Sequence, residues 1–234
     1  MGIIKKFIKD QRGFSLVEIA IVLVILGLLI GGVLKGQELL ESARLNSILA
    51  QVNQYQLATA TFMDRYGALP GDYDKASENI HPKLQNGKGN GIIDGVGFGG
   101  GTRGAMDETV SFWAHLAAAN LIPSPGDPHP TLDFNKGVPA SRMGGGFTVE
   151  YQPLPNTSGH WLILGKKSGS RNTGALLTPQ QAFSIMNKGD SPDPRSGKIR
   201  AEDGQNAPRH GCVKANGQLN MLEKSPTCVL YFQL

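Results

Sequence analysis

Glu18 is the only ionisable side chain in the run of 21 residues from Phe14 to Leu34. A carboxylate inside an apolar helix costs roughly 2.5–3.5 kcal/mol on membrane-insertion scales, and such a group usually marks a functional pairing. A tolerated charge near the membrane surface is the alternative interpretation. At about 1.5 Å per residue, a helix of this length spans a bilayer core of about 30 Å. The chemistry predicted for Glu18 is therefore ion pairing in an apolar environment.

Positive charge is concentrated before this run. Residues 1–13 have four basic side chains and one acidic side chain, a net charge of +3, out of +4 for the whole chain: Lys5, Lys6, Lys9, Arg12 and Asp10. The nearly neutral remainder gives no support for nucleic acid or anionic lipid as partners. The positive-inside rule predicts that residues 1–13 stay in the cytoplasm and that the rest faces outward. No small-residue cleavage site follows the run, so we expect the segment to be retained.

The residues around this junction carry a resemblance. Arg12-Gly13-Phe14-Ser15-Leu16-Val17-Glu18 resembles the processing site of type IV prepilins and type II secretion pseudopilins. The resemblance implies that a peptidase cleaves after Gly13, that the new N-terminal residue Phe14 is methylated, and that Glu18 lies fifth in the mature chain. Cleavage would create a positive amine at Phe14. Glu18 of a neighbouring subunit could neutralise it, so Glu18 is a candidate for setting the register of assembly.

One helix of about 50 residues is predicted, because apolar positions continue at steps of three and four after Leu34. These positions are Ile48, Val52, Tyr55, Thr59, Phe62 and Tyr66. Gly67 and Pro70 are typical of a helix end. The second half of the helix, residues 35–66, is expected to lie against a sheet. A stalk in a coiled coil is the alternative.

Residues 67–234 are predicted to form a loop-rich globular head. Nine glycines between Asn86 and Gly104 favour a loop. Asp107 is a candidate N-cap of a helix over 107–120, and Thr178-Pro179-Gln180-Gln181 is a capping box that opens a second helix. Strands are expected over 147–151, 160–164, 198–201 and 229–234. The fold class expected is α+β, a pilin-like lollipop with one long N-terminal helix packed on a small antiparallel sheet.

The two cysteines, Cys212 and Cys228, enclose 15 residues near the C-terminus. A disulfide is expected because the head should lie outside the cytoplasm. A loop of this length gains about 3 kcal/mol by the chain-entropy estimate. Pilins often close a C-terminal loop in this way, which implies a ring for subunit or surface contact. A simple staple on a loop-rich C-terminus is the alternative.

Other candidate chemistry is weak. The pattern G-x-G-x-x-G occurs at 95–100 without the strand and helix that a dinucleotide site requires. Residues 86–94 faintly resemble a calcium loop, but Lys88 stands where a carboxylate would be needed. The histidines have no zinc spacing: His81, His115, His129, His160 and His210. His115 is interpreted as a surface or partly buried residue. No nucleophile elbow exists, and Ser170 has no assigned base. We predict no metal, no cofactor and no enzymatic activity.

The function expected is that of a structural subunit of a type IV pilus-like filament. It would have a cleaved leader (1–13), a transmembrane and polymerisation helix (14–34), an amphipathic helix (35–66) and a head (67–234). The family implies a homo-polymer or mixed filament, a prepilin peptidase and methyltransferase, an inner-membrane platform and an assembly ATPase. It also implies a single inner-membrane pass with a periplasmic head, and then a place in a pilus or pseudopilus.

Three alternatives remain open at this point. The first is a pseudopilin of a type II secretion system, and the second is a membrane-anchored periplasmic enzyme or binding module. The third is a competence-type pilin that binds DNA through basic residues of the head. Its candidates are Lys166, Lys167, Arg171, Arg195, Lys198 and Arg200. Solvated loops are the favoured interpretation of these charges.

Overall fold

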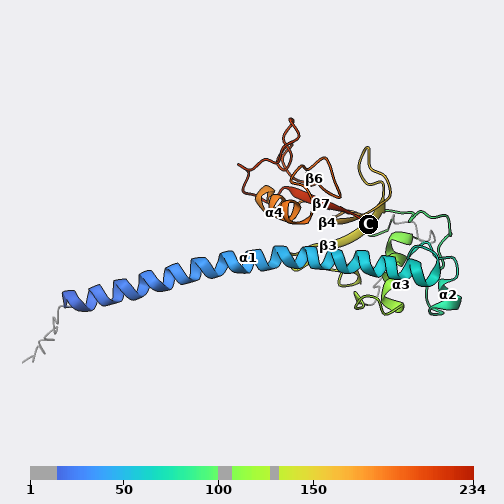
Figure 1. Ribbon diagram of the computed structural model, residues 1–234, viewed down its shortest axis with the longest axis horizontal. Coiled ribbons are helices and arrows are strands. Elements are labelled where there is room, and N and C mark those ends of the chain that lie inside the picture. Colours follow the sequence, from blue (N-terminus) through green and yellow to red (C-terminus); the bar gives the residue numbers. More distant parts are fainter. Residues whose placement is uncertain (1–14, 100–106, 127–131) are drawn as a thin grey trace, which may run out of the picture. The chain divides into compact units, whose positions relative to one another are not determined.

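The computed structural model describes residues 15–99, 107–126 and 132–234 of the 234-residue chain. The chain divides into two compact units, Met1–Ala43 and Arg44–Leu234, and the second is called the head unit below. Helix α1 (Leu16–Tyr66) belongs to both units (Figure 1). The other elements lie in the head unit: α2 (Ala76–Asn79), α3 (Glu108–Ala118), β1 (Asp133–Phe134), β2 (Gly137–Val138), β3 (Gly146–Tyr151), β4 (His160–Ser168), β5 (Arg171–Gly174), α4 (Pro179–Gly189), β6 (Ile199–Asp203) and β7 (Cys228–Gln233). The predicted α+β class, a long N-terminal helix followed by a small antiparallel sheet, is confirmed.

The part of α1 within the head unit presents one apolar stripe to the core. Five of the six predicted stripe residues are buried, and Tyr66 is half-buried. The helix ends as the sequence predicts. Gly67 has φ +69° and donates its N–H to the carbonyl of Met63 at 2.8 Å. A residue without Cβ adopts this left-handed conformation at little cost, so the chain turns away there.

The main sheet has the strand order β3-β4-β7-β6, with β5 paired to β4. Every pairing in it is antiparallel. Successive side chains of a strand point to opposite faces. In β4, Leu162 and Leu164 join the core that contains α1, whereas Trp161 and Ile163 join a second cluster with Val229. Both faces of β4 are therefore covered, which accounts for its continuous apolar run.

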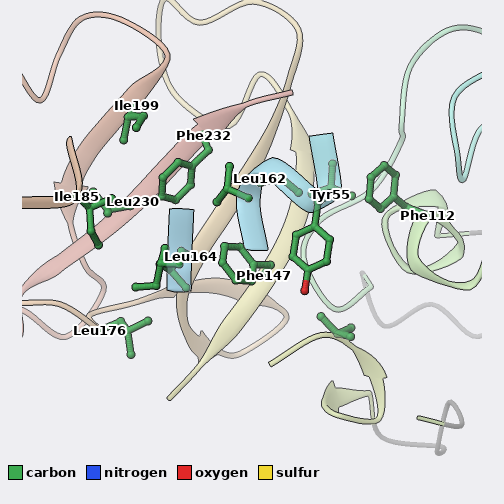
Figure 2. Close-up of a cluster of buried hydrophobic side chains, with 14 of the residues drawn as sticks. Tyr55, Phe112, Phe147, Leu162, Leu164, Leu176, Ile185, Ile199, Leu230 and Phe232 are labelled. Atoms are coloured by element: carbon green, nitrogen blue, oxygen red, sulfur yellow. The ribbon is translucent and has the colours of Figure 1, made fainter. Parts of the chain in front are cut away.

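The main core lies between α1 and one face of the sheet. Tyr55 of α1 makes an edge contact with Phe147 of β3, with ring centroids 5.3 Å apart (Figure 2). Trp113 of α3 packs edge-on against the same Tyr55 ring at 5.0 Å. The sheet side is supplied by inward residues of four strands: Phe147, Val149, Leu162, Leu164, Leu230, Phe232, Ile199 and Ala201. The N-terminal helix thus contributes directly to the hydrophobic core of the head unit.

The head unit also has elements that the sequence predicted only in part. The capping box of α4 is present: the Gln181 N–H donates to the Thr178 hydroxyl at 3.2 Å, and the Gln181 amide oxygen accepts from the Thr178 N–H at 3.0 Å. Asp107 lies at the N-cap position of α3, as predicted. The short strands β1, β2 and β5 and the one-turn helix α2 were not predicted from the sequence. Each is too short to give a periodic signal.

The interpretation of His115 as a surface or partly buried residue is wrong. Its side chain is fully buried on α3. Nδ1 accepts a hydrogen bond from the Gly71 N–H at 2.9 Å, and Nε2 lies 2.8 Å from the Gln85 carbonyl oxygen. This pattern assigns the proton to Nε2. Burial lowers the pKa of His115, because the charged form would lose solvation and could no longer accept from Gly71.

Candidate functional site

The described part of α1 before the head unit has an uncovered apolar surface. Every Val, Leu and Ile from Leu16 to Leu34 is exposed, from 43% for Ile19 to 89% for Leu16. An 18-residue window of this helix has a mean hydropathy of 2.8, and none of the window is buried. By length and composition the helix can cross a membrane. Isolated in water, such a surface would be unfavourable at about 25 cal/mol per Å².

Glu18 lies in the first turn of α1. Its Oε2 accepts a hydrogen bond from the Ser15 N–H at 3.2 Å, and the Ser15 carbonyl accepts from the Ile19 N–H at 3.2 Å. Ser15 is therefore at the N-cap and Glu18 three positions later, which is one half of a capping box. Sequence reasoning missed this local role, although the spacing Ser15-x-x-Glu18 signals it. The predicted cleavage and methylation residues, Gly13 and Phe14, lie outside the described residues.

A disulfide joins Cys212 to Cys228, with Cα atoms 4.9 Å apart. Both cysteines are fully buried, and Cys228 begins strand β7. Asp203, at the end of β6, holds the start of the enclosed loop. Its carboxylate accepts the N–H groups of His210 at 2.7 Å, Cys212 at 2.7 Å and Val213 at 3.0 Å. Sequence reasoning missed Asp203, because nothing in the neighbouring sequence distinguishes it from an ordinary aspartate at the end of a strand.

An open groove of about 650 Å³ lies between α4 and the disulfide-closed loop. Its walls combine an aromatic ring, prolines and four polar side chains: Phe183, Pro192, Asp193, Pro194, Arg195, Asn216, Gly217, Gln218, Leu219 and Met221. Two of the exposed large apolar side chains of the head unit, Phe183 and Met221, line it. The groove brings Arg195 against the loop, since its guanidinium lies 3.2 Å from where a Cβ on Gly217 would be.

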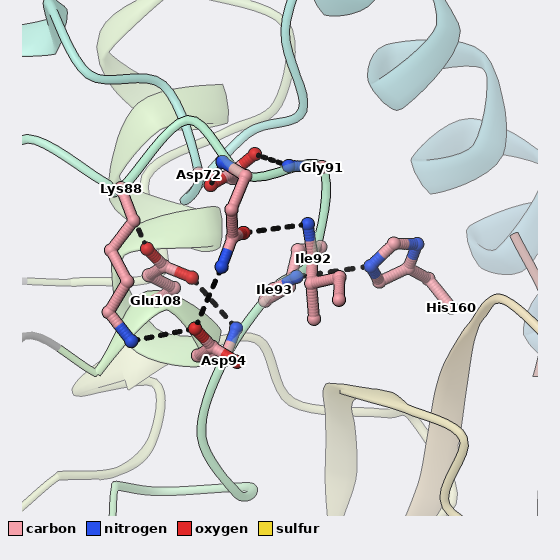
Figure 3. A network of polar contacts seen from close by, with 9 residues as sticks. Asp72, Lys88, Gly91, Ile92, Ile93, Asp94, Glu108 and His160 are labelled. Carbon is pink, nitrogen blue, oxygen red and sulfur yellow. Dashed lines mark hydrogen bonds and ion pairs between the residues drawn. The ribbon is translucent and has the colours of Figure 1, made fainter.

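The loop that faintly resembles a calcium site is organised by carboxylates and an ammonium (Figure 3). Asp72 accepts the N–H groups of Asn90 and Gly91 at 3.0 and 2.7 Å. Glu108 of α3 accepts those of Lys88 and Asp94 at 2.8 and 2.7 Å. The Lys88 Nζ then lies 2.6 Å from Asp94 Oδ2. No group of three or more ligating side chains suited to a metal ion occurs among the described residues.

Three pKa shifts describe the electrostatics of this loop. Burial raises the pKa of the Glu108 carboxyl, although the two N–H groups that it accepts oppose this shift. The hydrogen bond from Lys88 lowers the pKa of Asp94, and the same bond raises the pKa of Lys88. Lys88 is therefore held as an ammonium beside Asp94, and the position at which a calcium loop would need a carboxylate carries a positive charge instead.

The six basic residues considered for DNA binding fall into two groups. Lys166 and Lys167 end β4 and Arg171 begins β5, whereas Arg195, Lys198 and Arg200 precede or belong to β6. Strand β7 lies between β4 and β6. The Lys167 ammonium donates to the Leu132 carbonyl and lies 4.8 Å from the centre of the Phe98 ring. The Arg200 guanidinium lies 5.4 Å from the centre of the Trp161 ring. Two of the six thus contact aromatic rings of the head unit itself.

An apolar helix that can cross a membrane by length and composition, joined in one chain to an α+β head with a disulfide, is typical of membrane-anchored proteins. The family comparison specifies the class further. Residues 8–34 match the model of the prokaryotic N-terminal methylation motif, the signature of type IV prepilins and pseudopilins. The chain therefore carries the N-terminal segment of a type IV pilin-like or pseudopilin precursor. The signature implies filament assembly and processing by a prepilin peptidase. No curated protein and no solved structure matches the chain significantly.

Proposed function

We propose that this protein is a structural subunit of a type IV pilus-like filament, made as a prepilin and polymerised through α1. One coincidence supports the proposal. The methylation motif covers residues 8–34, and the Val, Leu and Ile side chains of the same stretch, from Leu16 on, are not covered by any of the described residues. An uncovered apolar helix must be covered by lipid or by other helices. In a subunit that moves from the membrane into a filament, lipid covers the helix first and the helices of other subunits cover it afterwards.

The proposal assigns each N-terminal feature a step. A prepilin peptidase removes residues 1–13 by cleaving after Gly13, and the amine of Phe14 is methylated. The helix then crosses the inner membrane once, with the head unit on the periplasmic side. An inner-membrane platform and a cytoplasmic ATPase drive the subunit into a homo-polymer or mixed filament at the cell surface. The protein is a substrate of these enzymes, and its own role is structural.

Glu18 is the proposed register residue. Before assembly its carboxylate caps α1 through the Ser15 N–H. In a bundle of helices an unpaired charge is strongly unfavourable, whereas a pair of opposite charges is much less so. The amine created at Phe14 of one subunit and Glu18 of the next can form such a pair only at one axial offset. The pair would therefore fix the stagger between subunits.

Separating the charge of Glu18 from its capping role needs the right substitution. Glu18→Gln keeps an amide oxygen that can accept the Ser15 N–H, because capping boxes accept Glu or Gln, but it removes the negative charge. In the native host we expect Glu18→Gln to lower recovery in sheared surface filaments by at least about tenfold, the effect of roughly 1.4 kcal/mol. Glu38→Gln is the matched control, since Glu38 pairs with Lys35 of its own helix at 2.8 Å. Normal filament recovery for Glu18→Gln would refute the register role.

The same fractions test the proposed function as a whole. N-terminal sequencing should find methylated Phe14 as the first residue of protein sheared from the cell surface. Processed protein that stays in the cell envelope would instead favour a pseudopilin of a type II secretion system. Unprocessed protein that retains residues 1–13 would overturn both, and would favour a membrane-anchored module with a simple anchor.

A further inference from the structure

The sequence contains three Asn-Gly pairs: Asn86-Gly87, Asn90-Gly91 and Asn216-Gly217. At such a pair the backbone nitrogen of glycine can lose its proton and attack the side-chain Cγ of asparagine. The new C–N bond closes a five-membered succinimide as the side-chain nitrogen leaves as ammonia. Water then opens the ring to an aspartyl or a β-linked aspartyl residue, so a neutral amide becomes a carboxylate. Glycine favours the attack because it has no Cβ to obstruct it.

Asn216 lies at the tip of a small hairpin inside the disulfide-closed loop. The Gly217 N–H donates to the Lys214 carbonyl at 2.9 Å, the Lys214 N–H donates to the Gln218 carbonyl at 2.8 Å, and Gly217 has φ +87°. This is a three-residue loop closed by a glycine bulge. Asn216 is exposed. The peptide that must rotate for attack therefore belongs to an exposed turn rather than to the core.

Two features of this turn favour the reaction. The Gln218 N–H donates to Asn216 Oδ1 at 3.1 Å. A donor at that oxygen stabilises the negative charge that develops on it during attack, as in an oxyanion hole. Asn90 has the same kind of donor, since the Ile92 N–H donates to its Oδ1 at 2.9 Å, so the surrounding charges distinguish the two sites. The Arg195 guanidinium is a cation beside Gly217, and Asp193 lies in the same groove wall. Positive potential favours both the deprotonated glycine nitrogen and the carboxylate product.

Asn90 has the opposite electrostatic surroundings. Asp72 accepts the N–H groups of both Asn90 and Gly91, and Asp94 Oδ2 accepts from the Asn90 amide at 3.3 Å. Glu108 and the Lys88 ammonium complete the cluster, so three carboxylates face one cation. A glycine nitrogen held by a carboxylate is harder to deprotonate in this field. The new product charge would also meet like charges.

Asn86 is protected by packing. Its Oδ1 accepts the Ser77 N–H at 2.8 Å, and the Gly87 N–H donates to the Tyr73 carbonyl at 2.8 Å. A Cβ on Gly87 would overlap the backbone of Asp72, so the Asn86-Gly87 peptide has no room to rotate. The surroundings of the two pairs before α3 thus oppose the reaction in different ways, by close packing at Asn86 and by negative charge at Asn90. The pair in the disulfide loop makes similar hydrogen bonds but lies in an exposed turn beside a guanidinium.

We propose that Asn216 is a spontaneous modification site, at which deamidation converts the neutral tip of the disulfide loop into an anionic wall of the groove facing Arg195. The fold protects Asn86 and Asn90 from the same reaction. Carboxylate formation opposite a guanidinium would change the groove from a nearly balanced surface to one with an added ion pair. The reaction needs only water and is independent of filament assembly.

The test is peptide mass analysis of the full-length protein, kept in detergent at mildly alkaline pH and sampled over time. We expect the deamidated fraction at Asn216 to grow at least about tenfold faster than at Asn86 or Asn90, a difference of roughly 1.4 kcal/mol in barrier. Reduced, urea-unfolded protein is the reference. There the three rates should converge, because all three pairs have the same local sequence Asn-Gly.

Variants make the result specific. Gly217→Ala should slow the reaction at Asn216 several-fold without changing the other two sites, and Asn216→Gln should abolish it because a six-membered ring must form instead. Equal rates at the three sites in folded protein would overturn the proposal, as would faster conversion at Asn90. A deamidation rate at Asn216 that does not exceed the rate at Asn86 in the folded protein would overturn it as well.

Discussion

The two units differ in how the apolar side chains of α1 are covered. In the head unit, the stripe of α1 from Leu45 to Phe62 is buried against a sheet and against α3. In the first unit, the same helix has fourteen aliphatic side chains between Leu16 and Leu34, and every one is exposed. The head unit thus meets its hydrophobic requirement from its own sequence. The first unit needs a surface that the described residues do not supply, and we propose that the function depends on it.

The largest expected effect tests whether the head unit is self-sufficient. Trp113 is fully buried between Tyr55 and Phe112, and its indole N–H has no hydrogen-bond partner within the described structure. Trp113→Ala should lower the free energy of unfolding by about 3–5 kcal/mol, since it leaves a large cavity. Urea unfolding of full-length protein in detergent, followed by Trp161 fluorescence, measures this. Leu28→Ala is the control in the first unit and should leave the transition unchanged. A shift for Leu28→Ala equal to that for Trp113→Ala would break the comparison.

The disulfide comes next in size. Replacing both Cys212 and Cys228 by alanine should cost about 3 kcal/mol, the chain-entropy value for a loop of about 15 residues. The same unfolding measurement applies. A reducing agent should lower the stability of the wild-type protein to that of the double variant and should not affect the double variant. Unchanged stability would mean that Asp203 and β7 hold the loop without the bond.

A pH effect sharpens the comparison within the head unit. Burial lowers the pKa of His115 in the folded protein, whereas in the unfolded chain the pKa is about 6.5. Below about pH 6.5 the unfolded chain therefore binds a proton at His115 that the folded protein does not bind. The contribution of His115 to the free energy of unfolding is therefore complete above about pH 6.5. It is lost as the pH falls toward the pKa of the folded state, by at most about 1.4 kcal/mol per pH unit. His115→Gln should remove this part of the slope. Exposed His81→Gln should keep it.

Other buried or half-buried groups change the pH dependence of stability with the opposite sign. Burial raises the pKa values of Glu108, Glu150 and Glu202. Their contribution to stability is complete below about pH 4.3 and is lost as the pH rises through the raised values. The difference between wild type and His115→Gln is free of these carboxylates, because both proteins contain them. A difference that does not change with pH would show that His115 titrates normally.

The smallest expected effect concerns a single cap. Thr178→Ala removes the hydroxyl that accepts the Gln181 N–H and should cost about 1 kcal/mol. Gln181→Glu should cost much less, since either residue completes a capping box. Hydrogen exchange of the first turn of α4 would localise the change. Equal losses for the two variants would point to packing of α4 rather than its cap.

Sequence reasoning succeeded where one local rule determines the structure. The stripe from Ile48 to Tyr66 fixes which face of α1 is buried, and Gly67 fixes its end. The capping box at Thr178 is a pairing of neighbours three positions apart. The alternating strand Phe147–Tyr151 shows its two faces directly. In each case the partners lie within a few residues, so a pattern in the sequence is enough.

It failed where the partner is distant in the chain. His115 is buried because Gly71 and Gln85 satisfy its ring, and neither is near it in sequence. Asp203 matters because three N–H groups around the start of the disulfide loop converge on it. Strand β5 exists through pairing with β4 and has too few residues to signal itself. The Glu18 cap is a different case, since the sequence contained the signal and the membrane interpretation obscured it.

The loop before α3 has a consequence for its chemical environment. Its positive charge is the Lys88 side chain, which is bonded to the same polypeptide as the carboxylates around it. A tethered ammonium cannot be diluted, exchanged or removed by a chelator, so this positive charge stays beside Asp94 whatever cations the medium contains. The loop before α3 therefore carries its counter-charge in its own sequence.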